Sequence, residues 1–125
     1  MNSKIIIIGA GHGGLYAAKI LADAGADVTV YEKSAFDKIS HDRTDCIEVK
    51  LFKETGLPLP EGSYTGHCCS FVGPYTDEMM YIYTEEPIRD ITVGRKAFAH
   101  MLINRAEESG VKFVFETEVE ALIVE

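Results

Sequence analysis

The fold is decided by residues 5–33, which read IIIIGAGHGGLYAAKILADAGADVTVYEK. The four consecutive isoleucines at its start predict a β-strand with both faces buried, as in a parallel sheet covered by helices. A glycine cluster follows at once, and apolar residues at helical spacing from Leu15 to Ala24 then predict a helix that Gly25 ends. A second apolar run at 28–31 predicts another strand. These elements form the strand–helix–strand unit of a parallel sheet.

The glycines between the first strand and the helix have the spacing of a loop that binds a diphosphate. Gly9 permits a tight turn, Gly11 lets the backbone approach the phosphates, and Gly14 lets the helix lie close to the strand. The N-terminus of the helix then supplies free N–H donors and partial positive charge. The candidate cofactor-binding glycines are Gly9, Gly11, Gly13 and Gly14.

An acidic residue, Glu32, follows the second strand at the position that contacts a ribose in dinucleotide-binding folds. Its carboxylate can accept the protons of both ribose hydroxyls, and it would repel a 2′-phosphate. This favours FAD or NAD over NADP. The competing interpretation is a glycine-rich turn with an incidental surface glutamate. Within the loop, we expect His12 to face solvent, with proton donation to a phosphate as the alternative.

Residues 34–93 interrupt the regular pattern. Glycines and prolines punctuate this stretch, which we interpret as an excursion of loops and small strands. The expected strands lie near 70–72, 80–83 and 91–93, and a short helix is expected around 46–54.

Regular elements resume after the excursion. Residues 95–109 have a helical apolar face, 111–115 predict a third strand, and the alternation at 118–125 predicts an edge strand. The predicted fold class is therefore α/β, with a Rossmann-like parallel sheet and helices on its faces. Its strands are expected at about 4–8, 28–31 and 111–115.

The charge and the composition disfavour two classes of partner. Twelve basic and twenty acidic residues give a net charge of −8, which disfavours nucleic acid and anionic membranes as partners. The N-terminal apolar run is far too short to span a membrane. We therefore expect neither nucleic acid nor a membrane as a partner.

The chain has three cysteines, Cys46, Cys68 and Cys69, which lack the spacing of a metal site. Their odd number and the adjacent pair favour a reduced, cytoplasmic protein with buried thiols. We assign no metal site. No nucleophile–base pair stands out, so no catalytic residue is assigned either.

The residues Gly9, Gly11, Gly14, Ala18 and Glu32 resemble the FAD-binding opening of the glutathione-reductase-like flavoproteins. Within that group the chain is most similar to the branch that contains aromatic-ring hydroxylases and geranylgeranyl reductases. The excursion and the run from Val93 to Leu102 support this likeness.

The resemblance implies further cofactor contacts and a function. It suggests that Lys33 is the basic residue after the acid, that Arg95 reaches the flavin nucleotide, and that the backbone of Val119 lies against the adenine. Arg43 takes the place of a flavin-proximal arginine, although the surrounding loop matches poorly. The implied function is an FAD-binding module of a flavin-dependent oxidoreductase, monooxygenase-like or reductase-like.

Flavoproteins of this kind are much longer than 125 residues. We therefore expect residues 1–125 to be a single dinucleotide-binding domain from the N-terminal part of a larger flavoprotein, inactive alone, with 34–93 as an inserted excursion. Two alternatives stay open: an NAD-binding dehydrogenase domain, and a non-catalytic nucleotide-binding assembly module, which predicts a homodimer. The sequence leaves the small-molecule substrate and the electron donor unknown.

Overall fold

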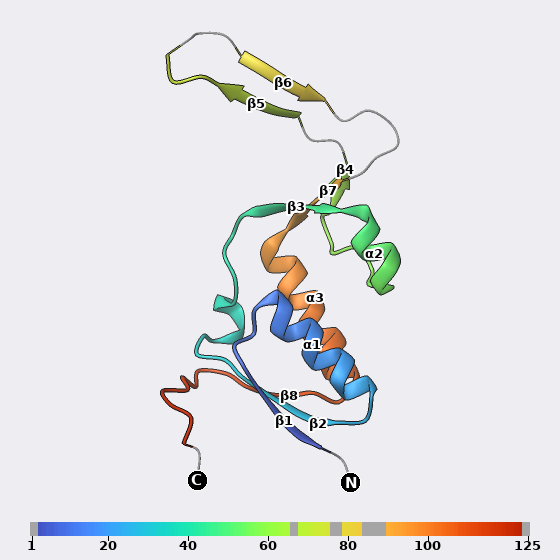
Figure 1. Cartoon of the computed structure of the whole chain (residues 1–125), viewed down its shortest axis with the longest axis vertical. Coiled ribbons are helices and arrows are strands. Elements are labelled where there is room, and N and C mark those ends of the chain that lie inside the picture. The colour runs from blue at the N-terminus through green and yellow to red at the C-terminus, as the bar shows by residue number, and fades with distance from the viewer. Residues whose placement is uncertain (1–2, 66–67, 76–78, 84–89, 124–125) are drawn as a thin grey trace. The chain divides into compact units, whose positions relative to one another are not determined.

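The computed structural model describes residues 3–65, 68–75, 79–83 and 90–123 (Figure 1). For 68–72 and 79–83, it describes the backbone alone. The chain divides into two compact units. One combines residues 1–42 with 95–125, and the other comprises 43–94.

The first unit contains the parallel sheet, in the strand order β1–β2–β8. Ile6 pairs with Thr29 across β1 and β2, and Val30 pairs with Phe113 across β2 and β8. The predicted α/β class and the three core strands are thereby confirmed. The elements of this unit are β1 (Lys4–Ile8), α1 (His12–Asp23), β2 (Asp27–Tyr31), the short 3-10 helix η1 (Phe36–Lys38), α3 (Arg95–Glu108) and β8 (Lys112–Val114).

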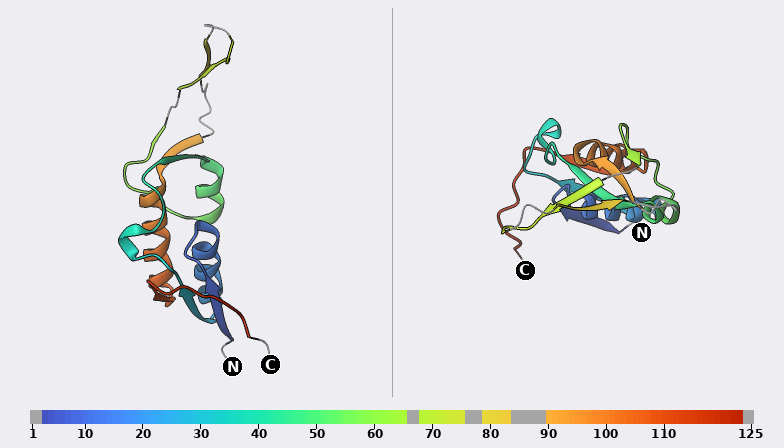
Figure 2. Two further views of the ribbon diagram at one scale, coloured as in Figure 1. Left: turned by 90° about the vertical axis from the view of Figure 1, so that its left-hand side faces the viewer. Right: turned by 90° about the horizontal axis from the view of Figure 1, so that it is seen from above.

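The core of this unit lies between the sheet and its helices. α1 packs on the sheet, mainly over β2, and α3 packs against α1 (Figure 2). Val28 and Val30 of β2 are fully buried, as is Leu15 of α1. Leu102 and Ile103 anchor α3 in the same core. This packing holds the N-terminus of α1 at the end of β1.

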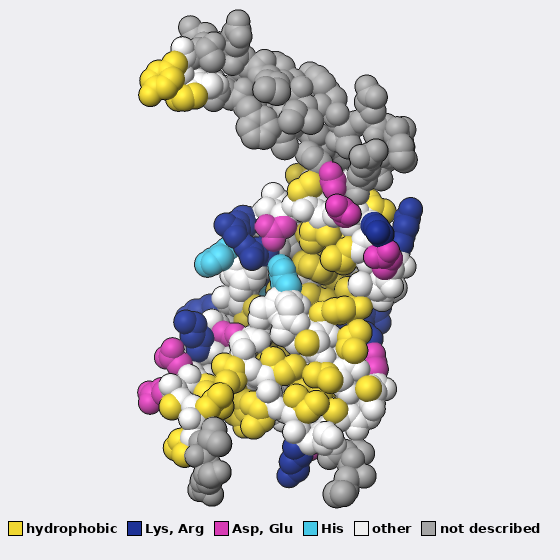
Figure 3. Space-filling view, viewed as in Figure 1, with side chains coloured by type: hydrophobic (Ala, Val, Ile, Leu, Met, Phe, Trp, Pro, Cys, Tyr) yellow, Lys and Arg dark blue, Asp and Glu magenta, His cyan; other side chains and the backbone are white. Residues whose placement is uncertain are grey.

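The expectation that β1 is buried on both faces is wrong for the described part of the chain. Ile6 and Ile8 remain 65% and 52% exposed, whereas Ile5 and Ile7 on the opposite face are half-buried. Hydrophobic side chains accordingly gather at the surface over this region (Figure 3). Side chains alternate between the two faces of a strand, so the run of four isoleucines fills both faces although only one is covered.

The expected edge strand at 118–125 is also wrong, because the described residues 118–123 form an irregular segment. Glu116 has a φ of 54°, and this left-handed turn takes the chain away from the sheet. The backbone N–H of Thr117 then donates to the carbonyl oxygen of Glu32 at 3.0 Å. The segment thus crosses the end of β2 instead of extending the sheet.

The second unit is antiparallel. β7 pairs with both β3 and β4, and β5 pairs with β6. The three predicted small strands are confirmed, and the predicted helix begins three residues later than expected, because 46–48 belong to a strand. The elements are β3 (Thr44–Glu48), α2 (Val49–Thr55), β4 (Tyr64–Thr65), β5 (Cys68–Val72), β6 (Met79–Tyr83) and β7 (Asp90–Gly94).

The thiol of Cys46 is exposed, which corrects the expectation of burial for this cysteine. The cause is the alternation along β3, which turns Cys46 to the same exposed face as Thr44 and Glu48. The side chains of Cys68 and Cys69 lie outside the described part of the structure. Among the described helices of both units, none is long and apolar enough to cross a membrane.

Candidate functional site

The Gly-rich loop, residues 9–14, connects the end of β1 to the first turn of α1. Gly9 has a φ of 95°, a conformation that favours glycine, and its N–H donates to the carbonyl oxygen of Tyr31 at 2.8 Å. A Cβ atom on Gly14 would lie 2.6 Å from the carbonyl oxygen of Gly9. Glycine at 14 is therefore what lets α1 start so close to the strand, as its spacing predicts.

Glu32 follows β2 and is fixed by two backbone donors. Its Oε2 accepts the N–H of Ala10 at 2.7 Å, and its Oε1 accepts the N–H of Ser34 at 2.8 Å. Burial raises the pKa of Glu32, but the hydrogen bonds from Ala10 and Ser34 and the charge of Lys33 outweigh it and bring the pKa below its ordinary value. The two hydrogen bonds thus fix the orientation of the Glu32 carboxylate, and one of them joins it to the Gly-rich loop at Ala10.

The Glu32 cavity has a volume of about 240 Å³ and lies on one side of the Gly-rich loop. It brings together four of the residues singled out in the sequence. The irregular segment after β8 forms its far wall, so the chain's turn at Glu116 helps to build it. Its lining residues are Ile8, Gly9, Tyr31, Glu32, Lys33, Thr117, Glu118 and Val119.

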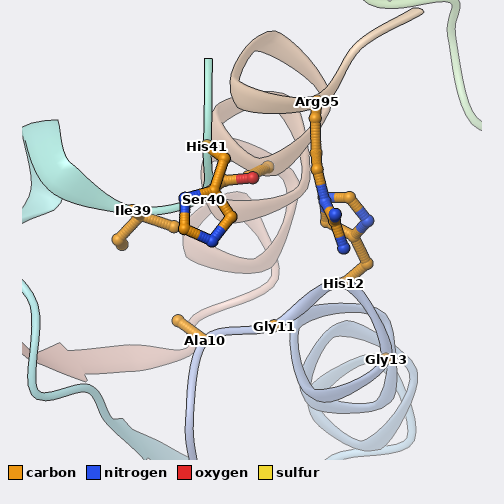
Figure 4. A pocket seen from close by; sticks show the side chains of 9 residues that line it. Ala10, Gly11, His12, Gly13, Ile39, Ser40, His41 and Arg95 are labelled. Carbon is orange, nitrogen blue, oxygen red and sulfur yellow. The ribbon is translucent and has the colours of Figure 1, made fainter. Parts of the chain in front are cut away.

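The Arg95 cavity, of about 430 Å³, lies against the other part of the Gly-rich loop. In Figure 4, the side chains of Ser40 and His41 come from one side of it and those of His12 and Arg95 from the other. His12 and Arg95 are the first residues of α1 and α3, so the N-termini of both helices contribute to its wall. The lining residues are Ala10, Gly11, His12, Gly13, Ile39, Ser40, His41, Arg95 and Ala99.

The walls of the Arg95 cavity suit an anion. Helix N-termini carry partial positive charge, and a guanidinium forms strong, charge-assisted hydrogen bonds with phosphate oxygens. Gly11 and Gly13 present their backbone to the cavity without a Cβ atom. A diphosphate matches this combination of donors.

His12 differs from its expected place. Instead of facing solvent, it is half-buried, and its ring packs against the ring of Phe98 with 4.8 Å between the centroids. The first turn of α1 is thereby joined to α3 beside the Arg95 cavity.

The structure does not bring every predicted residue to the cavities. Arg43 is exposed and belongs to the other unit, and it lines neither cavity. Conversely, the wall formed by Ile39, Ser40 and His41 was not predicted from the sequence. A signal is hard to find there, because Ser40 has a φ of 67° at a position where the sequence has no glycine.

The two cavities share the Gly-rich loop as a common wall. Gly9 lines the Glu32 cavity, whereas Gly11 and Gly13 line the Arg95 cavity. One cavity offers a carboxylate that can accept hydroxyl protons, and the other offers donors for phosphate oxygens. A molecule with a ribose at one end and a diphosphate next to it would satisfy both.

Comparison with known proteins agrees with this geometry. A family model described as FAD binding domain matches residues 2–125. A search of curated proteins found no match.

Several solved structures share the fold. One is a geranylgeranyl bacteriochlorophyll reductase-like protein from Thermoplasma acidophilum, with 16% identity and a TM-score of 0.77, covering 100% of this chain and 33% of that one. Another is the tetrameric form of 2-methyl-3-hydroxypyridine-5-carboxylic acid oxygenase, with 21% identity and a TM-score of 0.72, covering 94% and 32%. A third is the flavin-dependent halogenase CmlS, with 24% identity and a TM-score of 0.70, covering 97% and 24%. The chain thus spans a third or less of the length of these relatives.

Proposed function

The chain belongs to the FAD binding domain family, and from this premise we propose that its two cavities hold the adenosine and the diphosphate of FAD. The observation that carries the proposal is that both cavities border the same Gly-rich loop. A ligand that crosses the loop meets the carboxylate of Glu32 first and the cationic side chain of Arg95 second. This is the order of chemical groups along the ADP part of FAD.

In the Glu32 cavity, we assign ribose binding to Glu32. Each of its carboxylate oxygens accepts one backbone N–H and keeps capacity for another donor, so both can accept ribose hydroxyl protons. Val119 and Lys33 line the same cavity and would contact the adenosine. The low pKa of Glu32 keeps it in the accepting, ionised form at neutral pH.

In the Arg95 cavity, we assign diphosphate binding to the backbone of the Gly-rich loop and to Arg95. Gly11 and Gly13 allow close approach, and the N-terminus of α1 supplies donors. His12 lines the cavity at that terminus and would stand next to the phosphates. Arg43 stays a predicted flavin-proximal residue.

At the level of the whole protein, we propose part of a flavin-dependent oxidoreductase with an unidentified small-molecule substrate. Bound flavin supplies the electron transfer, and the residues described above bind and orient its nucleotide. We favour the glutathione-reductase-like group, and within it the branch of aromatic-ring hydroxylases and geranylgeranyl reductases. In support, the similar structures include a geranylgeranyl reductase-like protein and an oxygenase. The chain spans a third or less of these relatives, so we expect cofactor binding without turnover from these 125 residues alone.

Several broader expectations stay predictions. They are a single domain over 1–125 with 34–93 as its inserted excursion, and a cytoplasmic location. The alternative of a non-catalytic assembly module also predicts a homodimer. The exposed Ile6 and Ile8 offer an apolar surface that a second copy could cover. Light scattering tests the dimer, and a monomer at all concentrations would contradict it.

Titration of the protein with FAD, followed by flavin fluorescence, tests the assignment of the cavities. Replacing Glu32 by Gln removes the negative charge and turns one of the two acceptor oxygens into an N–H donor, so only one oxygen can still accept a ribose hydroxyl proton. We expect FAD affinity to fall about tenfold or more. Glu107→Gln, at an exposed position of α3, is the matched control and should bind as the unmodified chain does. Equal FAD affinity of both variants would contradict ribose binding by Glu32. Displacement of FAD by equimolar NADH would instead favour the NAD-binding alternative.

A further inference from the structure

The 34–42 segment, which joins β2 to the second unit, forms one wall of the Arg95 cavity. Three consecutive residues, Ile39, Ser40 and His41, line that cavity. The segment contains the short 3-10 helix η1 and is otherwise irregular, so it lacks the hydrogen-bond ladder that fixes a strand or a long helix. Its position therefore depends on particular anchoring contacts.

The main anchor is Phe36, the first residue of η1. Its ring stacks on the ring of His100 with 4.5 Å between centroids and 12° between planes. The Nε2 atom of His100 also lies 3.2 Å from the carbonyl oxygen of Phe36. Because a carbonyl oxygen only accepts, Nε2 carries the proton and donates it. The ring of His100 thus contacts both the side chain and the backbone of Phe36.

A second ring also contacts Phe36. The ring of Phe115, which follows β8, meets the ring of Phe36 edge-on at 5.8 Å. Phe36 nevertheless remains 42% exposed, so burial in the core does not fix it. Its two aromatic partners, one from α3 and one after β8, carry the anchoring.

The conformation that these contacts maintain is costly. Ser40 has a φ of 67°, in the left-handed region that a serine rarely adopts. Such a residue keeps its conformation only where its neighbours fix it, and it is typical of functional sites. Phe36 fixes the chain before Ser40, and Ile39, which is almost completely buried, fixes it beside Ser40.

We propose that His100 is a positioning residue for the cofactor, acting through Phe36 on the wall of the Arg95 cavity. The inference rests on the proposed function and adds a residue that lines neither cavity. The Glu32 cavity has its own supports, two hydrogen bonds that do not involve Phe36. They are the hydrogen bond from Ser34 to Glu32 and that from Glu116 to the carbonyl oxygen of Ser34, at 2.8 Å and 3.2 Å. His100 should therefore affect binding of the diphosphate and leave binding of the adenosine unchanged.

Competition against FAD fluorescence separates the two cavities, with adenosine as the probe of one and ADP as the probe of both. We expect His100→Ala to lower the affinity for ADP about tenfold and to leave the affinity for adenosine unchanged. Tenfold is the size of effect expected from losing one ring stack and one hydrogen bond. His100→Phe keeps a ring and loses the hydrogen bond, so its effect on ADP should be intermediate. Asn104→Ala, exposed on the same helix, is the matched control.

The ratio of the ADP and adenosine affinities decides the proposal, because general destabilisation would not change it. Thermal unfolding of each variant without ligand checks that it folds, and His100→Phe serves if His100→Ala does not. An unchanged ratio in a folded His100 variant would overturn the positioning role and leave the proposed function standing. If the unmodified chain bound neither adenosine nor ADP, the proposed function would fail, and this inference with it.

Discussion

Two of the walls of the Arg95 cavity, the Gly-rich loop and the 34–42 segment, are held by different means. The Gly-rich loop is fixed by its own backbone, since Gly9 takes a left-handed φ and Gly14 leaves room for the carbonyl oxygen of Gly9. The 34–42 segment is fixed by side chains from elsewhere, principally His100 and Phe115. The position of the Gly-rich loop thus depends on glycines, which have no side chain, whereas the position of the 34–42 segment depends on aromatic side chains that contact it.

This difference decides how each wall responds to mutation. A backbone that approaches another backbone cannot move aside locally, so adding even a methyl group at Gly14, where the two backbones meet, should have a large effect. A segment held by rings at its surface can shift, so changes there should be mild and should affect binding more than folding. The following predictions test this contrast, from the largest expected effect to the smallest.

The largest effect is expected for Gly14→Ala. The new Cβ would lie 2.6 Å from the carbonyl oxygen of Gly9, a backbone atom, so α1 must move away from β1. We expect the free energy of unfolding to fall by about 1–3 kcal/mol, and FAD affinity to fall with it. Urea unfolding followed by circular dichroism measures the first, and fluorescence titration measures the second.

Gly13→Ala is the matched control for the unfolding measurement alone, because Gly13 itself lines the Arg95 cavity. Apart from its chain neighbours and the backbone of its own helix, no described atom lies within 4 Å of the place of its Cβ, and the residue belongs to the first turn of α1. Its free energy of unfolding should stay the same or rise by roughly 0.5–1 kcal/mol, as expected when alanine replaces glycine in a helix. Equal losses at positions 13 and 14 would show that close packing is not the reason for the glycine at 14.

An intermediate effect is expected from acid. The folded-state pKa of Glu32 lies below its ordinary value of 4.5, so its ionised form stabilises the fold. That contribution is fully present above about pH 4.5 and is lost as the pH falls through the lower folded-state pKa. The stability difference between the unmodified chain and Glu32→Gln should therefore shrink as the pH falls from 5 to about 3. A difference that stays constant over that range would contradict the role of the hydrogen bonds to Glu32.

The smallest effect is expected for Ser40→Gly. Glycine removes the cost of the left-handed φ of 67° but makes the unfolded chain more flexible, so the net gain in stability should be only about 0.5 kcal/mol. Ser40→Ala keeps that cost and is the control at the same position. Thermal unfolding compares the two variants. A glycine variant no more stable than the alanine variant would show that Ser40 is not strained.

The same contrast explains which features could be predicted from the sequence and which could not. The core strands, the Gly-rich loop and Glu32 were predictable, because each depends on residue types close together in the chain. The anchoring of Phe36 by His100 was not, because the two residues are 64 positions apart and share no local pattern. Arg95 and Val119 were placed only through the likeness to known flavoproteins, and the structure puts both in the walls of the cavities.

The errors in prediction have physical causes as well. A run of four isoleucines cannot reveal which face of a strand is covered, so the exposure of Ile6 and Ile8 was missed. Alternation at 118–125 was interpreted as a strand, although the left-handed turn at Glu116 directs the chain across Glu32. Periodicity describes how side chains alternate, and does not tell whether a neighbouring strand is available.

The first unit is discontinuous in sequence, so the residues that line its two cavities are synthesised at different times during translation. The ion pair between Lys112 and Asp27, at 2.9 Å, joins β8 to β2 across 85 positions. β1, α1 and β2 leave the ribosome early, but the wall at Val119 and the helix that starts at Arg95 emerge much later. A nascent chain that ends before residue 95 therefore has the Gly-rich loop but lacks Arg95 and Ala99 of one cavity and residues 117–119 of the other. Nucleotide capture should accordingly be a late event, after most of these 125 residues have been translated.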